Sequence, residues 1–441
     1  MGGAPAQPNA LSARAGAPVL VAHPGAAHFI YELVVAASAL GFPTRFATGF
    51  YHDDAGALAK VLERLPERLR ARLIRELGRR RFDGIDPTQV DRHPLLELPY
   101  VAAARLLPRR PETVERVLYW RNRRFDAAVA RAIERRPPAI VIGHDTSALR
   151  CLRAAKRAGS ATVLNQVIGH LAVGDAILRE EAALHPEFAD SLHAGAPRWL
   201  IEQCRAEALE ADCVLAPSDY VRRTLIEQGV APARIALVPF GVRVERFKPP
   251  ERPRDDGVFR LLYVGQISQR KGIKYLLEAV KRLALPNLEL VLVGGMVGSG
   301  AGLAPYAGHF RHVPNVPHAE VQRLFQSADL FVYPSLHEGS ALAIFEAMAS
   351  GLPVITTENA GSMVRDGLDG YLVPLRDPDA IAQRIAELHG DPARRRALGA
   401  SARRRAEQFT WGHYRERLGA VLDALVAPDR QATPIANAVT V

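Results

Sequence analysis

The sequence predicts an α/β protein in which two doubly wound, Rossmann-like domains face a common cleft. Short apolar runs alternate with amphipathic segments along most of the chain, a pattern typical of parallel sheets covered by helices on both faces. The 441 residues are enough for two domains that each bury a core, and the alternation is interrupted once, near residue 250. Ligands of such sheets bind at the carboxyl ends of the strands, so we expect the functional site in the cleft.

The N-terminal series of elements is expected over residues 18–243. Its strands are short and apolar, and we place them at 18–23, 139–145, 161–166, 213–218 and 234–241. A helix is expected over 29–40, with Gly41 as its stop, and another over 218–228. Residues 1–17 are rich in Ala, Pro and Gly, and they are predicted to form a flexible tail.

A linker is predicted at 244–257, where three prolines and many charged residues interrupt the apolar pattern. The C-terminal series follows over 258–408. Its strands are again short and apolar, and we place them at 259–265, 288–295, 328–335, 353–358 and 370–374. Helices are expected at 272–283 and around 345–350. A further helix should begin at Pro378 with Asp377 as its N-cap, and residues 428–441 should form a second flexible tail.

The composition is that of an ordinary globular protein, with 48% hydrophobic and 24% charged residues. Its apolar runs fall far short of the ~20 residues that a membrane-spanning helix needs. The three cysteines are odd in number and form no C-x-x-C pair, which argues against a disulfide framework or a structural zinc site. The N-terminus lacks the pattern of a signal peptide. We therefore expect a cytoplasmic protein. Peripheral contact with the inner face of the plasma membrane is the alternative location to test.

Most of the net charge of +10 comes from one stretch of the chain. Residues 60–136 hold 20 Lys or Arg against 11 Asp or Glu. Within it, leucines recur at helical spacing among arginines over 60–81, which predicts a basic amphipathic helix. This helix is either a solvated face or a docking face for an anionic membrane. The stretch has few aromatics and no nucleic-acid motif, so no nucleic-acid partner is expected.

The strongest chemical signal is the segment HEGSALAIFEAMASGLPVI, which begins at His337. It carries Glu338 in a loop after a predicted strand and Glu346 in the helix that follows, with seven residues between them. Carboxylates can accept hydrogen bonds from sugar hydroxyls, and amides at a helix start can hold a phosphate. By spacing alone, an N-terminal cap followed by a surface glutamate remains an equal alternative.

Three further features lie at the ends of predicted strands. Arg270 and Lys271 follow the strand that ends at Gly265 and precede a helix, an arrangement that suits a pyrophosphate. Gly25 follows the first strand, where it would let backbone approach a ligand. His144 ends another strand at the same edge of the cleft. Ordinary loop charges and a structural histidine are the alternatives for the cations and for His144.

Together these segments resemble family 4 glycosyltransferases, which are retaining enzymes of the GT-B fold and the group 1 type. The resemblance covers most of the chain and rests on four segments in order: 218–249, 337–355, 366–374 (DGLDGYLVP) and 409–414 (FTWGHY). It implies that residues 409–427 form a closing helix that crosses back to the N-terminal domain. It also implies that the N-terminal domain takes the acceptor and the C-terminal domain the nucleotide sugar.

The resemblance implies a role for each matching residue. Glu346 is expected to bind the ribose hydroxyls, and Glu338 to contact hydroxyls of the transferred sugar. Lys271, with Arg270 beside it, is expected to neutralise the diphosphate, near which the backbone of Gly25 should lie. His144 is expected to hydrogen-bond the donor sugar. The rest of the donor site is expected in the two C-terminal loops, at Gly265, Gln266, Gly339, Ser340, Ala341 and Leu342.

Two positions depart from the family pattern. Gln266 stands where an arginine commonly follows the glycine, so we expect Arg270 to compensate for the missing cation. Ala341 stands where a glycine is common, so its methyl group is expected to crowd backbone near the sugar. No metal site is expected, because the two cations can neutralise the leaving diphosphate. The D-x-D sequence at Asp377 is interpreted as a helix cap.

The expected activity is retaining transfer of a sugar from a nucleotide-diphosphate donor, such as a UDP- or GDP-sugar, with no further cofactor. The acceptor should be a saccharide or a lipid-linked molecule, in the synthesis of cell envelope, capsule or exopolysaccharide. Three alternatives stay open at this point: a nucleotide-sugar epimerase, a sugar phosphorylase and a non-catalytic nucleotide-sugar-binding protein.

Overall fold

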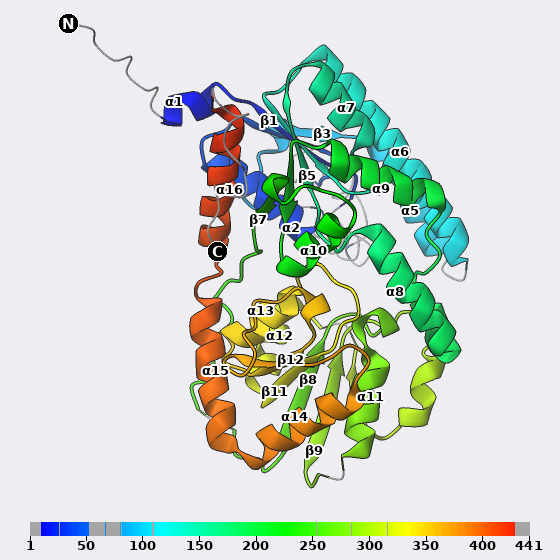
Figure 1. Ribbon diagram of the computed structural model, residues 1–441, viewed down its shortest axis with the longest axis vertical. Helices are drawn as coiled ribbons and strands as arrows, with labels where there is room; N and C mark the ends of the chain where they lie inside the picture. The colour runs from blue at the N-terminus through cyan, green and yellow to red at the C-terminus, as the bar shows by residue number, and fades with distance from the viewer. Residues whose placement is uncertain are drawn as a thin grey trace, which may run out of the picture.

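The computed structural model describes residues 10–427 apart from 26, 53–66, 68–79, 81, 108, 109, 253, 284 and 315. Figure 1 shows two α/β domains stacked along the long axis, the N-terminal one above the C-terminal one. Each contains a single parallel sheet with helices packed on it, which confirms the predicted fold class. The basic helix predicted over 60–81 lies almost entirely outside the described residues.

The N-terminal sheet has seven parallel strands in the order β3-β2-β1-β4-β5-β6-β7. They are β1 (Val19–His23), β2 (Thr44–Thr48), β3 (Val90–Arg92), β4 (Ile140–His144), β5 (Ala161–Asn165), β6 (Cys213–Ala216) and β7 (Ile235–Leu237). Its helices are α2 (His28–Ala39), α5 (Pro94–Leu106), α6 (Pro111–Arg135), α7 (Leu149–Arg157), α8 (Leu171–Leu184), α9 (Arg198–Glu210) and α10 (Asp219–Glu227). Two apolar clusters fill the space between the sheet and its helices.

The C-terminal sheet has six parallel strands in the order β10-β9-β8-β11-β12-β13. They are β8 (Phe259–Val264), β9 (Leu288–Val293), β10 (Arg311–Val313), β11 (Leu330–Tyr333), β12 (Val354–Thr356) and β13 (Gly370–Leu372). Its helices are α11 (Ile273–Arg282), α12 (His318–Gln326), α13 (Leu342–Ala349), α14 (Pro378–Gly390) and α15 (Pro392–Ala406). No helix of the described residues is long and apolar enough to cross a membrane.

Three strands were not predicted. Two of them, β3 and β10, are sheet-edge strands of three residues that contain charged residues. An edge position leaves one side of a strand open to water, so a short, polar segment can pair there without an apolar run. The third, β2, lies between β3 and β1, and its polar first residues, Thr44 and the exposed Arg45, interrupt the apolar pattern. The predicted cap of α14 is confirmed, since Asp377 Oδ1 accepts a hydrogen bond from Ala380 N at 2.8 Å.

The N-terminal tail is more ordered than its composition suggests. Residues Ala10–Ala15 form helix α1, so the prediction of a flexible tail over 1–17 is wrong for this part. The guanidinium of Arg14 donates two hydrogen bonds to the carboxylate of Asp423, at 2.7 and 2.5 Å. This paired contact between the two ends of the chain fixes a segment whose own sequence carries little apolar surface.

The chain crosses between the domains twice, and the two crossings are hydrogen-bonded side by side. Val242 N donates to Phe409 O at 2.9 Å, and Val242 forms a parallel bridge with Thr410. After the second crossing, helix α16 (Trp411–Val426) packs on α2, and its buried face joins the N-terminal core. Figure 1 shows α16 running back beside the upper domain. The last helix is therefore part of the domain in which the chain starts.

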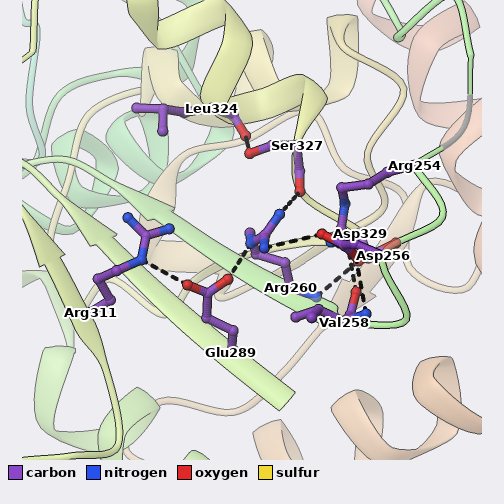
Figure 2. A network of polar contacts seen from close by, with 9 residues as sticks. All are labelled: Arg254, Asp256, Val258, Arg260, Glu289, Arg311, Leu324, Ser327 and Asp329. Atoms are coloured by element: carbon purple, nitrogen blue, oxygen red, sulfur yellow. Dashed lines mark hydrogen bonds and ion pairs between the residues drawn. The ribbon is translucent and has the colours of Figure 1, made fainter. Parts of the chain in front are cut away.

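The predicted linker has neither helix nor strand, yet it is held at both ends. Arg403 donates hydrogen bonds to the carbonyls of Val244 and Phe247, at 3.1 and 2.7 Å. At the other end, Arg254 pairs with Asp256 and Asp329, as Figure 2 shows. The same network continues through Arg260, Glu289 and Arg311 at the amino ends of the C-terminal strands. The linker thus runs along the C-terminal domain as a fixed segment.

A third contact between the domains involves α8 and the turn Pro186–Ser191 that follows it. The fully buried carboxylate of Glu181 accepts hydrogen bonds from Gln269 at 2.6 Å, Tyr275 at 2.8 Å and Arg376 at 2.7 Å. Arg376 adopts a φ of 61°, which is unfavourable for a residue with a Cβ. We call these four residues the Glu181 clasp. It joins the N-terminal helix α8 to two elements of the C-terminal domain.

All three cysteines are buried in the N-terminal domain and form no disulfide. Burial raises the pKa of Cys213 to about 12, and it raises the pKa values of Cys151 and Cys204 well above the ordinary value. The thiols therefore stay protonated in the folded protein at neutral pH. This agrees with the composition, which argues against disulfides and metal–thiolate sites.

The paired crossings lead to a prediction about Gly241. A Cβ at this position would lie 2.3 Å from the amide nitrogen of Trp411, and backbone cannot give way as a side chain can. We expect Gly241→Ala to destabilise the protein by about 1–3 kcal/mol, as overpacking does. Thermal unfolding should detect this as a drop of the melting temperature, since ~1 kcal/mol corresponds to about 2–4 °C in domains of this size.

The matched control is Gly390→Ala, because a Cβ on Gly390 meets no atom within 4 Å. This control should leave the melting temperature unchanged or slightly raised. If Gly241→Ala melted like Gly390→Ala, the close approach of the two crossings would not constrain the fold.

Candidate active site

Both sheets reverse their strand order at one point, and ligands of doubly wound sheets bind beside such points. In the N-terminal sheet the point lies between β1 and β4, where the rings of His23 and His144 are 4.8 Å apart. In the C-terminal sheet it lies between β8 and β11, where Tyr263 and Tyr333 stack at 5.3 Å. The candidate residues follow these four strands.

The loop after β8 presents the two cations. The carbonyl oxygen of Gly265 would lie 2.0 Å from a Cβ on Gly294, so only glycine fits at position 294 in the neighbouring loop. Gln266 is exposed, and its carbonyl accepts a hydrogen bond from Tyr263 at 2.6 Å. The loop ends at Gly272, whose φ is 72° and whose missing side chain leaves room for the carbonyl of Pro334. These contacts set the position of Arg270 and Lys271.

Lys271, Arg270 and Glu338 form one charged cluster. The ammonium of Lys271 is paired with Glu338 Oε2, and Arg270 Nη1 lies 3.3 Å from the same oxygen. Arg270 also donates to the carbonyl of His337 at 2.8 Å, while Tyr333 OH lies 3.4 Å from Glu338 Oε2. The sequence predicted these three residues for one site, and the structure brings them together. An oxygen-rich, anionic ligand could exchange places with the carboxylate on the two cations.

Lys271 is 7% exposed, and its electrostatic surroundings act in opposite directions. Burial and the neighbouring guanidinium of Arg270 lower the pKa of Lys271 well below its ordinary value. The carboxylate of Glu338 beside the ammonium favours the charged form. A second anion beside the ammonium would favour its charged form further. The cluster is therefore suited to a ligand that brings negative charge, because that charge stabilises Lys271 as a cation.

The loop that carries Glu338 is pressed against the N-terminal domain. A Cβ on Gly339 would lie 1.7 Å from the carbonyl oxygen of Val167, so only glycine fits here. Ser218 Oγ donates to Gly339 O at 2.5 Å, and Gly169 N donates to Glu338 O at 3.2 Å. The domains are therefore in direct contact at the candidate donor loop.

The next three residues differ in what they offer to a ligand. Ser340 is buried, and its Oγ has no hydrogen-bond partner among the described residues. Ala341 is buried in the C-terminal core with an ordinary φ of −73°, and the expected crowding of backbone near the sugar stays a prediction. Leu342 starts α13 and packs against the N-terminal apolar cluster. An unsatisfied buried hydroxyl in this loop is a natural contact for a ligand oxygen.

Glu346 lies one turn into α13, half-buried. Burial raises the pKa of Glu346 to about 8, and the positive charge of Arg246 acts against this shift. The carboxyl group therefore holds a proton in the unliganded protein at neutral pH. Hydroxyl groups of a ligand, or a pH above 8, would favour its ionised form.

The N-terminal candidates are held within their own domain. His144 is 2% exposed, with Asn165 Nδ2 at 2.8 Å from Nε2 and Ala22 O at 3.2 Å from Nδ1. Burial and the neighbouring His23 lower the pKa of His144 well below its ordinary value, so the ring is neutral. Its contact with a donor sugar stays a prediction, and it would require one of these two hydrogen bonds to be exchanged.

Gly25 lies in the loop after β1, next to His23. The nearest atom to a Cβ on Gly25 would be 3.4 Å away, so protein contacts do not require glycine at this position. Gly49 is the glycine that the fold requires here, because a Cβ on it would lie 2.5 Å from the carbonyl oxygen of Pro24. Among the described residues, no hydrogen bond or ion pair joins Gly25 or His144 to the cluster of Arg270, Lys271 and Glu338.

Several further polar residues lie near these strand ends, and Thr146, Glu207 and Gln166 among them were not predicted. Asp145 follows His144, and burial raises its pKa to about 7. The next residue, Thr146, has a φ of 70° and is held by the fully buried Glu207, which accepts its N–H at 2.8 Å. Gln166, after β5, is 1% exposed with an unsatisfied Oε1. Only the tertiary fold gathers these residues, since Glu207 lies 61 positions from Thr146.

Arg121 is a further residue that the sequence did not single out. It is 7% exposed on α6 and pairs with Glu97 at 2.8 Å. Its guanidinium lies within 4 Å of the position that a Cβ on Gly25 would take. Burial lowers the pKa of His23 to about 4, and the charge of Arg121 contributes to this shift. In the sequence it is one arginine among many in a basic stretch, so nothing distinguishes it before folding.

The described part of the chain contains no group of three or more His, Cys, Asp or Glu side chains placed to bind a metal ion. Metal independence remains a prediction from the two cations. Together, the loops after β8 and β11 offer two cations, a carboxylate, an unsatisfied hydroxyl and the amides at the start of α13. Such a set can hold a diphosphate and the hydroxyl groups of a sugar.

Family models match both halves of the chain. The family model described as Glycosyltransferase Family 4 matches residues 23–246, and the model described as Glycosyl transferases group 1 matches residues 258–391. The first match ends within the predicted linker and the second begins directly after it, and together they cover most of the chain.

The chain also has similar relatives among curated proteins. It is 33% identical over 257 residues to the D-inositol 3-phosphate glycosyltransferase of Geodermatophilus obscurus, and the match covers 51% of this chain and 56% of that protein. It is 30% identical over 292 residues to the protein named putative glycosyltransferase EpsD of Bacillus subtilis, with coverages of 61% and 76%. The chain spans just over half the length of the inositol-phosphate glycosyltransferases that it matches.

Solved structures share the arrangement of both domains. The HepE protein of Anabaena, in complex with UDP and glucose, aligns with a TM-score of 0.59 at 14% identity, over 92% of this chain and 100% of that one. Sucrose-phosphate synthase from Thermosynechococcus elongatus aligns with a TM-score of 0.61 at 19% identity, over 93% and 99%. At these identities the likeness shows the fold, which is the predicted GT-B fold.

The raised pKa of Glu346 leads to a prediction about stability. The native state keeps this proton up to about pH 8, whereas the unfolded chain loses it near the ordinary pKa of a glutamate. The stability of the protein should therefore fall as the pH rises between these two values, because ionisation is opposed only in the native state. Glu346→Gln removes the titration, so its melting temperature should fall less than that of the wild type between pH 6 and pH 8.5, by a few degrees.

Thermal unfolding at several pH values measures this difference. Glu416→Gln is the matched control, since Glu416 is exposed and its loss should change the melting temperature equally at every pH. Parallel pH profiles for the wild type and Glu346→Gln would contradict the burial of this carboxyl group.

Proposed function

Because the chain belongs to glycosyltransferase family 4, we propose that it transfers a sugar from a nucleotide-diphosphate sugar to a saccharide or lipid-linked acceptor, with retention of configuration. The observation that carries this proposal is the cluster of Lys271, Arg270 and Glu338 at the strand-order reversal of the C-terminal sheet. Two cations converge there on one carboxylate, in the loops where doubly wound sheets bind phosphorylated ligands.

The donor would bind mainly to the C-terminal domain. Its diphosphate would take the place beside Lys271 and Arg270, with backbone amides at the start of α13 as further donors of hydrogen bonds. Glu338 would then turn from the cations to hydroxyls of the transferred sugar, and Glu346 would accept hydrogen bonds from the ribose. The unsatisfied Oγ of Ser340 supports the placement of a polar ligand in this loop. A UDP- or GDP-sugar has the charge and the hydroxyl groups that these residues require.

In the proposed reaction, the bond between the anomeric carbon and the diphosphate oxygen breaks, and a bond to the acceptor oxygen forms on the same face. The electron pair of the broken bond goes to the diphosphate, where Lys271 and Arg270 stabilise the added charge. The proton of the acceptor hydroxyl passes to an oxygen of the departing diphosphate. No side chain has to act as a nucleophile, and the two cations supply the charge neutralisation.

The acceptor would approach from the N-terminal domain, past the loops that carry Gly25 and His144. The contact between Gly339 and Val167 supports a closed arrangement in which the donor loop meets this domain. Closure would exclude water and hold the acceptor hydroxyl close to the anomeric carbon. We place the protein in the cytoplasm and its product in the synthesis of cell envelope, capsule or exopolysaccharide. Contact with an anionic membrane through residues 60–81 belongs to the same proposal.

A screen of nucleotide sugars tests the donor class. A ligand that binds only the folded state stabilises it and so raises the melting temperature. At a concentration of 100 times the dissociation constant, the gain in unfolding free energy is about 2.7 kcal/mol. We expect at least one UDP- or GDP-sugar to raise it, and a new glycoside to form when a saccharide acceptor is added. Formation of an altered nucleotide sugar alone, or of no product with any stabilising donor, would contradict the proposed transfer.

Substitution of Lys271 tests the role of the cations. Lys271→Ala should lower kcat by about 10²–10³-fold, because it removes a group that stabilises the leaving diphosphate. Lys281→Ala is the matched control, since Lys281 is an exposed lysine on α11 whose ammonium contacts only Pro305 O and the ring of Tyr306 among the described residues. A rate within about twofold of the wild type for Lys271→Ala would show that the diphosphate binds elsewhere.

A further inference from the structure

The outer surface of the N-terminal domain contains a groove that the proposed reaction does not use. It lies along α6, with α7 and the start of α9 as its other wall, and Figure 1 shows these helices together on the flank of the upper domain. Two adjoining hollows of about 800 and 410 Å³ form it, and they share Arg123, Arg150 and Trp199 as lining residues. We call this hollow surface the α6 groove.

Six arginines line the α6 groove, and they are all exposed: Arg116, Arg123, Arg124, Arg131, Arg150 and Arg153. In the part of the chain that the structure describes, Arg153 pairs with Glu210, and the other five form no ion pair with a carboxylate. Outside the groove, the exposed Arg157 pairs with Glu134 in the same way. Guanidinium groups gathered around a hollow without carboxylate partners provide a binding surface for anions.

Aromatic rings lie among these arginines. Trp120 and Trp199 are 41% and 39% exposed, which is unusual for side chains of this size. Tyr119 packs edge-on against Trp199 at 5.7 Å, and the guanidinium of Arg123 lies 5.3 Å from the same ring. The rings of Tyr119 and Trp199 are thus held in place before any ligand binds. Flat, pre-arranged rings beside hydrogen-bond donors suit the apolar faces and hydroxyl groups of sugars.

The shape and the charges of the α6 groove favour a saccharide over other polyanions. The rings line a hollow, whereas a surface that inserts into a membrane presents its apolar groups outward. Four carboxylates also line the two hollows, those of Glu112, Glu115, Asp126 and Glu202. They can accept hydrogen bonds from the hydroxyl groups of a saccharide, whereas a phosphate backbone offers them no hydrogen-bond donor. The arginines between residues 116 and 131 follow about 22 Å of helix, which suits an extended chain.

The α6 groove is linked to the candidate active site by a single loop. Leu149 and Arg150, which line it, begin α7 directly after the loop that follows His144. Gln203, also in the lining, donates a hydrogen bond to Thr146 O at 3.1 Å. An extended molecule in the groove would therefore approach the edge of the cleft where the N-terminal candidates lie.

We propose that the α6 groove binds the anionic saccharide chain of an extended acceptor, with the arginines on its acidic groups and the tryptophans on its sugar rings. The inference rests on the proposed transferase function, because it names the class of acceptor. It makes the groove a second binding site, outside the reaction centre, that holds the chain whose end is glycosylated.

Intrinsic fluorescence tests this proposal, because two of the three tryptophans of the chain line the α6 groove. The probe is a hexamer of galacturonate, and the neutral probe is maltohexaose. We expect the galacturonate hexamer to change the fluorescence with an affinity that falls as salt is added, and maltohexaose to bind at least tenfold more weakly. Arg124→Gln combined with Arg131→Gln should weaken binding of the galacturonate hexamer at least tenfold.

The matched control combines Arg396→Gln with Arg404→Gln, two exposed arginines on α15 without carboxylate partners among the described residues. It should bind the hexamer like the wild type. Equal binding by all three proteins, or no binding of the hexamer to the wild type, would overturn the proposal. So would vesicles of phosphatidylglycerol or single-stranded oligo(dT) that bind through Arg124 and Arg131 more tightly than the hexamer does.

Donor binding separates this result from the proposed function. Stabilisation by a nucleotide sugar involves the C-terminal loops, so it should be the same in the wild type and in both double variants. A galacturonate complex without any stabilising nucleotide sugar would contradict the transferase function and, with it, the role of the α6 groove as an acceptor site. Stabilisation by a nucleotide sugar without binding of the hexamer would contradict the groove alone.

Discussion

The side-by-side passage of the two interdomain segments is the constraint on which the rest of the molecule depends. Because Val242 is hydrogen-bonded to Phe409 and Gly241 leaves room for Trp411, the chain enters and leaves the C-terminal domain at one place. Helix α16 then joins the N-terminal core. Two sheets that are tied together in this way can present the carboxyl ends of their strands to a common cleft. A cleft between two bodies, joined at one edge, suits an enzyme that must bring two substrates together and release them.

The candidate site is formed by charges that compensate one another until a ligand arrives. Glu338 is paired with both Lys271 and Arg270, and Glu346 holds a proton. Both ring nitrogens of His144 lie within hydrogen-bond distance of a partner. In the proposed complex with a nucleotide sugar, each of these groups would exchange its present partner for the ligand. The unliganded protein therefore avoids an uncompensated buried charge, which would destabilise the fold. The same arrangement favours specific binding, because a ligand must supply a new hydrogen bond or ion pair for each one that it displaces.

The sequence predicted the fold correctly, and it predicted residues of the C-terminal loops that the structure brings into one cluster, for physical reasons. Buried strands such as β8 and β9 are apolar runs, and Arg270, Lys271 and Glu338 lie in short loops directly after strands. Residues such as Glu207, Gln269 and Arg121 could not be predicted, because their partners are distant in the sequence. Helix α1 was not predicted for the same reason, because Arg14 is hydrogen-bonded to Asp423, which lies 409 positions away in the sequence.

The burial of all three cysteines has a practical consequence for the study of domain motion. Their thiols have raised pKa values and lie within the N-terminal domain, so they should react slowly with labelling reagents. The C-terminal domain contains no cysteine at all. A pair of exposed cysteines introduced on either side of the cleft would therefore carry fluorophores without removal of the native thiols. Energy transfer between the two dyes could then follow opening and closing in single molecules, in a protein whose core is unaltered.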